Sequence, residues 1–443
     1  MPDTSPRALA LQLLRRFEGD SLYSNLILDT ALRRNPLSDA DRGLLTALVY
    51  GVIERRLTLN YLIGKLSDRP AAQLDTDVLI LLRMGIYQLR YMDRIPPHAA
   101  LNETVALAPR HAKGFVNAVL RQYTRVGETI ALPDAKTQPI ACLSVTHSVP
   151  EELCARFADI FGFERADAIL AHANTAPALT LRVNTQKTDG ASLCARLKEA
   201  GFPATPALHT DRALRLQGGN PTALPGFEAG EFFVQDEASI LCTQAVDARP
   251  GMTVLDICAC PGSKSFGMAI DMQNTGVLRA FDLHKNKLSL IETGAARLGL
   301  SCIHADARDG RNYDAALDAC ADRVLCDVPC SGYGVLAKKP EIRYKSPALA
   351  APLPDIQLAI AENAARYVKP GGVLLYSTCT LLPEENENNV ARFLARNPAF
   401  SLCPFTAGDI VCESGMLTLT PDRDGTDGFF MAKLVRNNEH DFQ

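Results

Sequence analysis

The chain has 443 residues and so exceeds the size of one ordinary hydrophobic core, which predicts two or three domains. With 47% apolar and 22% charged residues it has the composition of a folded globular protein, which excludes a chain that is disordered throughout. No apolar run approaches the roughly 20 residues that a membrane span needs, and the N-terminal segment lacks the layout of a signal peptide. We therefore expect a soluble, cytoplasmic protein.

The formal net charge of −4 is unfavourable for a nucleic-acid partner, but the charges are unevenly distributed. Residues 1–133 contain 17 Lys and Arg against 13 Asp and Glu, a net charge of +4, and the rest of the chain carries −8. A locally basic face matters more for binding RNA or DNA than the total charge. The N-terminal third is therefore the better candidate for a nucleic-acid contact, although its charge alone does not establish one.

Residues 1–134 predict an all-α domain. Apolar residues recur at i, i+3, i+4 and i+7 in successive segments, the pattern of helices that bury one face. Ser38 stands where it can cap a helix, and Asn35–Pro36 before it predicts a turn. A basic helix ends the domain, and a polar stretch near 127–140 predicts a linker. The expected helices cover residues 7–19, 23–34, 41–66, 77–92 and 113–125.

Residues 141–230 predict a small α+β module. The segment 150–162 has the pattern of a helix, 178–186 that of a strand, and 191–202 that of a second helix. Short strands separated by Gly and Pro follow.

Residues 231–437 predict an α/β domain of the Rossmann-like kind. Apolar strands at 253–259, 276–283, 322–328 and 371–378 alternate with amphipathic helical segments. This alternation indicates a mostly parallel sheet with helices on both faces. In such sheets ligands bind beyond the carboxyl ends of the strands, so functional residues should directly follow each apolar run.

The first candidate site is the turn DICACPGSKS (256–265), which follows the first of these strands. A strand-to-helix turn with a glycine allows a ligand close to the backbone and points amide donors at it. The turn matches neither a dinucleotide fingerprint nor a phosphate-binding P-loop, and it could also be purely structural. Its candidate cofactor-binding residues are Cys258, Ala259, Cys260, Pro261, Gly262, Ser263 and Lys264.

Two acidic residues near the ends of the next strands extend this candidate site. Asp282 ends the second strand, where a carboxylate can accept hydrogen bonds from ribose hydroxyls, or can simply be solvated. Asp306, after a third strand, could face an adenine or cap a turn. With the first turn, Asp282 predicts a nucleoside cofactor, and the missing glycine fingerprint disfavours a dehydrogenase that uses NAD.

Two cysteines follow later strands, in DVPCSGYG (327–334) and in YSTCT (376–380). Asp327 beside the thiol of Cys330 could hydrogen-bond a heteroaromatic base and hold it for attack. Pro383 suits the first position of a helix, whose N-terminus would favour a thiolate at Cys379. A strand-end cysteine can also be a packed apolar residue, and the residues alone do not rank the two thiols as nucleophiles.

The chain contains 13 cysteines, scattered rather than arranged as a disulfide framework, and we expect them to be reduced and mostly buried. A zinc site formed by Cys258, Cys260, Cys326 and Cys330 is disfavoured because these residues lack the paired spacing of zinc knuckles. We expect no metal.

The motifs DICACPGSKS, AFD, DVPCSGYG, KKPEIRYK and YSTCTLLPEENENNV, in this order, resemble those of S-adenosylmethionine-dependent RNA 5-methylcytosine methyltransferases. The segments LRVNT (181–185) and FFVQDEAS (232–239) resemble those that precede the catalytic domain of this family. The N-terminal helices are similar to the NusB-type RNA-binding domain, which points to the RsmB (Sun) branch. The one departure in the cofactor turn is Ser263, where the family has glycine.

The resemblance implies three parts: a NusB-like domain (1–134), a small RRM-like RNA-binding module (141–230) and a methyltransferase domain (231–437). It implies S-adenosylmethionine as cofactor, bound also by Asp327, and a cytosine of small-subunit (16S) ribosomal RNA as substrate. Cys379 would bond to C6 of the cytosine, Asp327 and Lys264 would assist, and Cys330 would help to release the product. RNA contacts would include Lys338, Lys339, Arg343 and Lys345. We expect a monomer without a protein partner.

Two alternatives remain open from the sequence. A DNA cytosine methyltransferase would use Cys330, in the Pro-Cys loop, as its nucleophile. A non-catalytic RNA-binding or antitermination factor would act through the N-terminal domain, but it would have no need for two cysteines and an acid at neighbouring strand ends.

Overall fold

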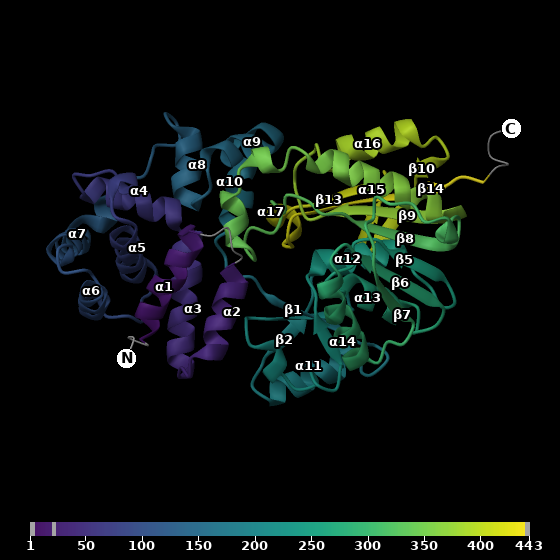
Figure 1. Ribbon diagram of the computed structural model, residues 1–443, viewed down its shortest axis with the longest axis horizontal. Coiled ribbons are helices and arrows are strands. Elements are labelled where there is room, and N and C mark those ends of the chain that lie inside the picture. Colours follow the sequence, from purple (N-terminus) through teal and green to yellow (C-terminus); the bar gives the residue numbers. More distant parts are fainter. Residues whose placement is uncertain (1–4, 20–23, 439–443) are drawn as a thin grey trace. The chain divides into compact units, whose positions relative to one another are not determined.

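The computed structural model describes residues 5–19 and 24–438 (Figure 1). The described chain forms two compact units. The first comprises the residues up to Asn174 together with Lys338–Lys345, and the second comprises Thr175–Ala337 and the residues from Ser346 onward. Helices α8–α10 therefore belong to the first unit, although the sequence grouped most of this region with the α+β module.

The first unit is all-α, as predicted, and its core is rich in leucine, isoleucine and valine. The side chain of Ser38 accepts the N–H of Asp41 and caps α3, as expected. The single helix predicted over 41–66 is wrong, because Arg55 (φ −103°, ψ 13°) leaves the helical conformation and divides it into α3 and α4. The helices are α1 (Pro6–Gly19), α2 (Ser24–Arg34), α3 (Asp39–Glu54), α4 (Arg56–Leu66), α5 (Thr76–Tyr91), α6 (Pro97–Ala106), α7 (Lys113–Val126), α8 (Pro139–His147), α9 (Glu151–Phe161) and α10 (Phe163–His172).

The segment Lys338–Lys345, drawn in green in Figure 1, joins this helical unit through a buried arginine. Arg343 is 0% exposed, and its guanidinium donates to the carbonyl oxygens of Glu54 (2.9 Å) and Ala173 (2.8 Å). The prediction that Arg343 contacts RNA is therefore wrong, because its guanidinium is buried and hydrogen-bonded inside the unit. Lys339 and Lys345 are exposed and Lys338 is half-buried, and their RNA contacts stay a prediction.

The second unit begins with a small antiparallel sheet of strand order β2-β3-β1-β4, which α11 covers. Alternate residues such as Leu181 and Val183 face this helix and form a compact apolar core with Leu193 and Leu197. The bounds are β1 (Leu179–Val183), α11 (Gly190–Glu199), β2 (Ala204–Pro206), β3 (Ala213–Leu216) and β4 (Phe232–Val234).

The rest of this unit is built on an eight-stranded sheet of order β10-β14-β9-β8-β5-β6-β7, with β13 paired to β14. Strands β5 to β9 are parallel, and β10, β13 and β14 add an antiparallel edge. The strands are β5 (Thr253–Asp256), β6 (Val277–Asp282), β7 (Ile303–Ala307), β8 (Ala321–Asp327), β9 (Val368–Thr378), β10 (Phe400–Leu402), β13 (Met416–Leu419) and β14 (Phe429–Arg436).

Helices cover both faces of this sheet, and the alternation of side chains along the strands decides which face each residue joins (Figure 1). Leu325 and Leu375 pack with α12–α14, whereas Val324 and Leu374 pack with α15 and α16. These helices are α12 (Glu237–Val246), α13 (Ser263–Asp271), α14 (Leu288–Leu298), α15 (Leu353–Tyr367) and α16 (Glu387–Arg396); a hairpin of β11 (Phe405–Ala407) and β12 (Ile410–Cys412) and the short α17 (Pro421–Asp424) complete the unit.

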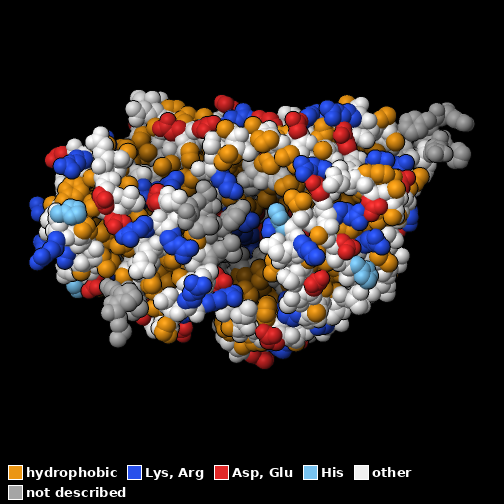
Figure 2. All heavy atoms as spheres, in the orientation of Figure 1, with side chains coloured by type: hydrophobic (Ala, Val, Ile, Leu, Met, Phe, Trp, Pro, Cys, Tyr) orange, Lys and Arg blue, Asp and Glu red, His pale blue; other side chains and the backbone are white. Residues whose placement is uncertain are grey.

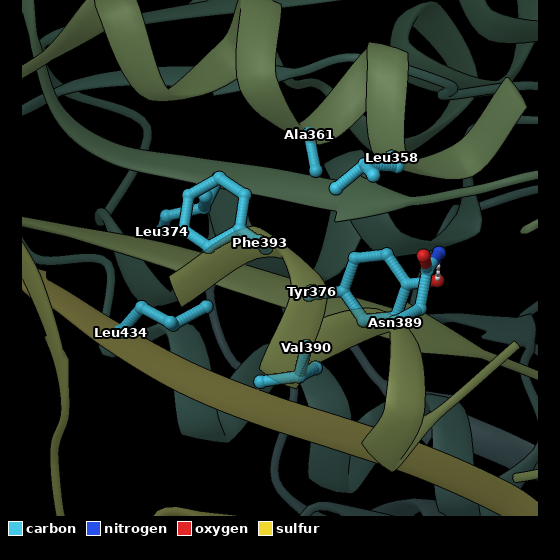
Figure 3. A pocket seen from close by; sticks show the side chains of 8 residues that line it. All are labelled: Leu358, Ala361, Leu374, Tyr376, Asn389, Val390, Phe393 and Leu434. Carbon is cyan, nitrogen blue, oxygen red and sulfur yellow. Dashed lines mark hydrogen bonds between the residues drawn. The ribbon is translucent and has the colours of Figure 1, made fainter. Parts of the chain in front are cut away.

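A small apolar pocket lies in the core between β9, β14, α15 and α16 (Figure 3). Six of its eight side chains are aliphatic or phenyl groups, and the polar groups of Tyr376 and Asn389 meet at one edge of it, where the Asn389 amide donates to the tyrosine oxygen (3.2 Å). The pocket is therefore part of the hydrophobic core, with one polar border.

Across residues 5–19 and 24–438, no helix combines the length and apolarity that crossing a bilayer would require. Within the same described ranges, no group of three or more His, Cys, Asp or Glu side chains is arranged to hold a metal ion.

A buried ion pair connects the small sheet to α13 and provides a test of stability. Arg182 is 1% exposed and donates to both oxygens of Asp271 (3.0 Å each), which Arg212 also contacts (2.5 Å). The substitution Asp271→Ala should lower the free energy of unfolding by about 3–5 kcal/mol, because it leaves the Arg182 charge buried without its partner. Urea titration of the full chain measures this loss.

The matched control is Asp355→Ala, which removes the partner of Arg392 (2.6 Å) at the surface. This exposed pair should contribute about 0–1 kcal/mol. Equal losses in the two variants would contradict the structural role assigned to the Arg182–Asp271 pair.

Candidate active site

Acidic or thiol side chains stand at the carboxyl ends of neighbouring parallel strands. Asp256 ends β5, Asp282 ends β6, Asp327 ends β8, and Cys379 directly follows β9. Because β9, β8, β5 and β6 are adjacent in the sheet, these residues share one edge, as the alternation of strands and helices predicts.

The turn from β5 to α13 places backbone donors at this edge. Gly262 caps α13 with φ +109°, and a Cβ there would lie 2.7 Å from the ring of Phe266, so the position requires glycine. The amide of Ala259 donates to the carbonyl oxygen of Phe281 (2.7 Å), which ties the turn to β6. This hydrogen bond fixes the turn against the end of β6.

Asp282 faces this turn. Its Oδ2 accepts the amide of Cys260 (3.3 Å), and its Oδ1 accepts the amide of His284 (2.9 Å). The half-buried carboxylate is thus oriented by two backbone donors and retains lone pairs for further donors, such as ribose hydroxyls. Asp306 is the penultimate residue of β7 and exposed, rather than following the strand as predicted.

Lys264 and Asp327 form an ion pair that joins α13 to β8. The ammonium donates to Oδ2 of Asp327 (2.7 Å), and the hydroxyl of Ser377 donates to Oδ1 (2.9 Å). Asp327 and Ser377 stand two residues after Leu325 and Leu375, so they lie on the α13 face of the sheet. Burial disfavours the Lys264 charge, but Asp327, Cys242 and Cys379 together outweigh burial and raise the pKa of Lys264.

Asp256 lies beneath this pair and accepts the hydroxyl of Ser265 (2.6 Å). Burial raises the pKa of Asp256 to about 7, and the hydrogen bond from Ser265 opposes this shift. The carboxyl group can therefore change its charge near neutral pH, next to the ion pair.

The two cysteines predicted at the strand ends are in contact. Their Sγ atoms lie 3.3 Å apart, and the backbone amide of Cys379 donates to Sγ of Cys330 (3.3 Å). The following hydroxyls, of Ser331 and Thr380, lie 2.7 Å apart. Hydrogen bonding with Cys379, burial and nearby negative charge raise the pKa of the Cys330 thiol well above its usual value. The sequence predicted both thiols, and the structure brings them together.

The predicted helix start at Pro383 is wrong. Pro383 does not begin a helix, because α16 begins at Glu387 and residues 383–386 form turns. The N-cap residue of α16 is Asn386, whose side-chain amide contacts Thr378 (2.6 Å) and Thr380 (3.0 Å) on either side of Cys379. Lys264 supplies a positive charge near Cys379. The interaction is mutual, because the charge of Cys379 is one of the influences that raise the pKa of this lysine.

Sequence reasoning missed three polar residues behind the cysteines. The hydroxyl of Ser377 donates to Asp327. The sequence signal that could have identified Ser377 was its position in β9, two residues before Cys379. Glu385 and Gln357 form a buried hydrogen bond (2.7 Å) and come from segments 28 residues apart in the sequence. No local pattern identifies that pair.

Comparisons with known proteins agree with this architecture. The sequence model described as 16S rRNA methyltransferase RsmB/F matches residues 243–435, the NusB family matches 4–125, and the ferredoxin-like domain of RsmF/B-like methyltransferases matches 149–223. The chain is similar over most of its length to the crystal structure of PH0851, with 26% identity, a TM-score of 0.79, and coverage of 98% of this chain and 99% of that one.

Two curated relatives extend the similarity over nearly the whole chain. The probable ribosomal RNA small subunit methyltransferase B of Bacillus subtilis is 38% identical, with 98% of this chain and 99% of the relative covered. The ribosomal RNA small subunit methyltransferase B of Klebsiella pneumoniae is 33% identical, with 97% and 98% covered. The predicted resemblance and fold class are thus confirmed, and the chain belongs to the family of ribosomal RNA small subunit methyltransferases B.

Proposed function

We propose that this enzyme methylates C5 of a cytosine in small-subunit ribosomal RNA through a transient bond between Cys379 Sγ and C6 of the base. The observation that carries the proposal is the pair of thiols 3.3 Å apart: Cys330 follows β8, which ends in Asp327 of the Lys264–Asp327 pair, and Cys379 follows the neighbouring strand β9. The relatives named as ribosomal RNA small subunit methyltransferases support the class of substrate.

S-adenosylmethionine is the cofactor, as predicted, because the chain belongs to a methyltransferase family. It supplies a methyl group activated by a sulfonium. The residues present fit its nucleoside part, because the carboxylate of Asp282, oriented beside the Gly262 turn, can accept ribose hydroxyls. Asp306 and the turn residues from Cys258 to Lys264 stay candidates for the same role.

A thiolate is needed because C5 of cytosine is a weak nucleophile. When Cys379 adds to C6, electrons move toward N3 and C5 becomes nucleophilic enough to take the methyl group. Asp327, which as a carboxylate only accepts hydrogen bonds, accepts the exocyclic amino group on the N3 side of the ring, and Lys264 stabilises the negative charge that develops at N3. Their mutual distance of 2.7 Å holds both groups in place before the base arrives.

The product is released by elimination. A base removes the C5 proton, the C6–S bond breaks, and its electrons return to Cys379 as a thiolate. Cys330 is the thiol in contact with the departing sulfur, and we assign it to this step. The net products are the methylated base, the demethylated cofactor and one proton.

The target base must leave its stack, which costs least in a single-stranded loop of RNA. Figure 2 shows Lys and Arg side chains spread over the drawn face of the N-terminal unit. With exposed Lys339 and Lys345 in the same unit, these can contact the phosphate backbone.

Single cysteine substitutions test the assignment of the thiols. Cys379→Ala should abolish methyl transfer to unmodified 16S RNA, because no bond to C6 can form. Cys330→Ala should still form that bond but release the product slowly, so a covalent protein–RNA adduct should accumulate. Transfer of a labelled methyl group and denaturing gels measure the two effects.

An adduct in the Cys379→Ala variant would contradict the assignment and favour Cys330 as nucleophile. A DNA substrate in the same assay separates the proposed reaction from DNA methylation. If the unaltered protein bound RNA but transferred no methyl group, a binding factor would be the better description.

The ion pair is tested by Lys264→Met, which should lower the single-turnover rate by about 10²–10³, as loss of one charge-stabilising donor does in other enzymes. The control is Lys369→Met. It breaks a similar contact, between Lys369 near the start of β9 and Asp322 near the start of β8 (2.8 Å). Equal rates for the two variants would show that Lys264 has only a structural role.

A further inference from the structure

A buried glutamate connects the two cysteine loops. Glu385 is 1% exposed, and its Oε2 accepts the backbone amide of Ser331 (3.0 Å), next to Cys330, and the side-chain amide of Gln357 (2.7 Å). Gln357 also donates to the carbonyl oxygen of Pro329 (3.0 Å). The carboxylate thus holds residues on both sides of Cys330 and belongs itself to the segment that follows Cys379.

The remaining contacts fix Glu385 but do not neutralise it. The hydroxyl of Tyr376 donates to its backbone oxygen (2.6 Å), and the donors to Oε2 are neutral amides. Among the residues that the structure describes, Oε1 is buried and has no hydrogen-bond partner. A buried carboxylate with one unused oxygen is costly for stability, which indicates a role beyond packing.

Opposite charges therefore flank two chemically equivalent thiols. The carboxylate of Glu385 acts on Cys330 and contributes to the raised pKa of that thiol, together with the contact to Cys379 and burial. The ammonium of Lys264 interacts electrostatically with Cys379. When one proton leaves such a pair for solvent, the other is shared, and the local field decides which sulfur carries the negative charge.

We infer that Glu385 is a positioning residue that keeps the shared proton on Cys330 and thereby makes Cys379 the nucleophile. The inference rests on the proposed function and adds the reason for the ranking of the two thiols. The amide of Cys379, which donates to Cys330 Sγ, acts in the opposite direction. Its influence on Cys330 is smaller than that of the Glu385 charge.

The substitution Glu385→Gln tests this inference in the full-length protein, because it removes the charge and keeps the size. Iodoacetamide reacts with thiolates, and peptide mapping by mass spectrometry reports each cysteine separately. In the unaltered protein Cys379 should react faster than Cys330. In Glu385→Gln the rate at Cys330 should rise relative to that at Cys379 by about tenfold, the effect of one pKa unit.

The matched control is Glu384→Gln, which removes the same charge from the exposed neighbouring position and should leave the ratio unchanged. If Glu385→Gln does not fold, Glu385→Met, which also removes the charge, should shift the ratio in the same direction. An unchanged ratio in the folded variants, or faster reaction of Cys330 in the unaltered protein, would overturn the inference.

A second readout separates this inference from the proposed function. Alkylation requires neither RNA nor cofactor, so its result stands even if no methyl transfer occurs. Under single-turnover conditions, Glu385→Gln should form the RNA adduct more slowly, whereas Glu385→Asp, which retains the charge, should recover part of the rate. Equal losses in both variants would indicate a packing role only.

Discussion

The ion pair between Lys264 and Asp327 is the interaction on which the site depends. It connects the first turn of α13 to the end of β8, and each charge would be costly in this half-buried place without the other. Its position follows from the alternation of side chains along parallel strands, which turns Asp327 and Ser377 toward the same helices. The pair places an acid where a base can be bound and a positive charge near Cys379.

A second charge, on Glu385, completes the electrostatic arrangement. Between Lys264 and Glu385 the two thiols are no longer equivalent, although both follow the end of a strand and their sulfurs are in contact. Catalysis by one of two adjacent cysteines requires such an asymmetry, because identical thiols in identical surroundings would ionise equally. Gln357 donates to the carboxylate of Glu385, and Tyr376 donates to its backbone oxygen. Tyr376 also lines the apolar pocket under α15 and α16.

The sequence predicted the parts of the fold that depend on local pattern. Helical periodicity identified most of α1–α7, and apolar runs identified β5, β6, β8 and β9 with the residues after them. The prediction from sequence failed where contacts between distant segments determine the local structure. Partners far away in the chain contact all three of the places where it failed. Ser148 accepts the amide of Leu57 just after the helix break at Arg55, Ser331 donates to Glu385 in the turns after Pro383, and Ala173 accepts the buried Arg343. A periodicity argument cannot include such partners, because it considers only neighbouring residues.

The sequence by itself therefore determined that a parallel sheet would present an acid-bearing turn and two cysteines at one edge, since strand order and side-chain alternation follow from the pattern. The family resemblance added their chemistry. Only the tertiary structure decided that the two sulfurs touch and that Lys264 pairs with Asp327. It alone also showed a buried glutamate 55 residues after Cys330 that binds the amide beside this cysteine. These contacts join segments that are far apart in the chain, and their energies depend on burial, which no single segment determines.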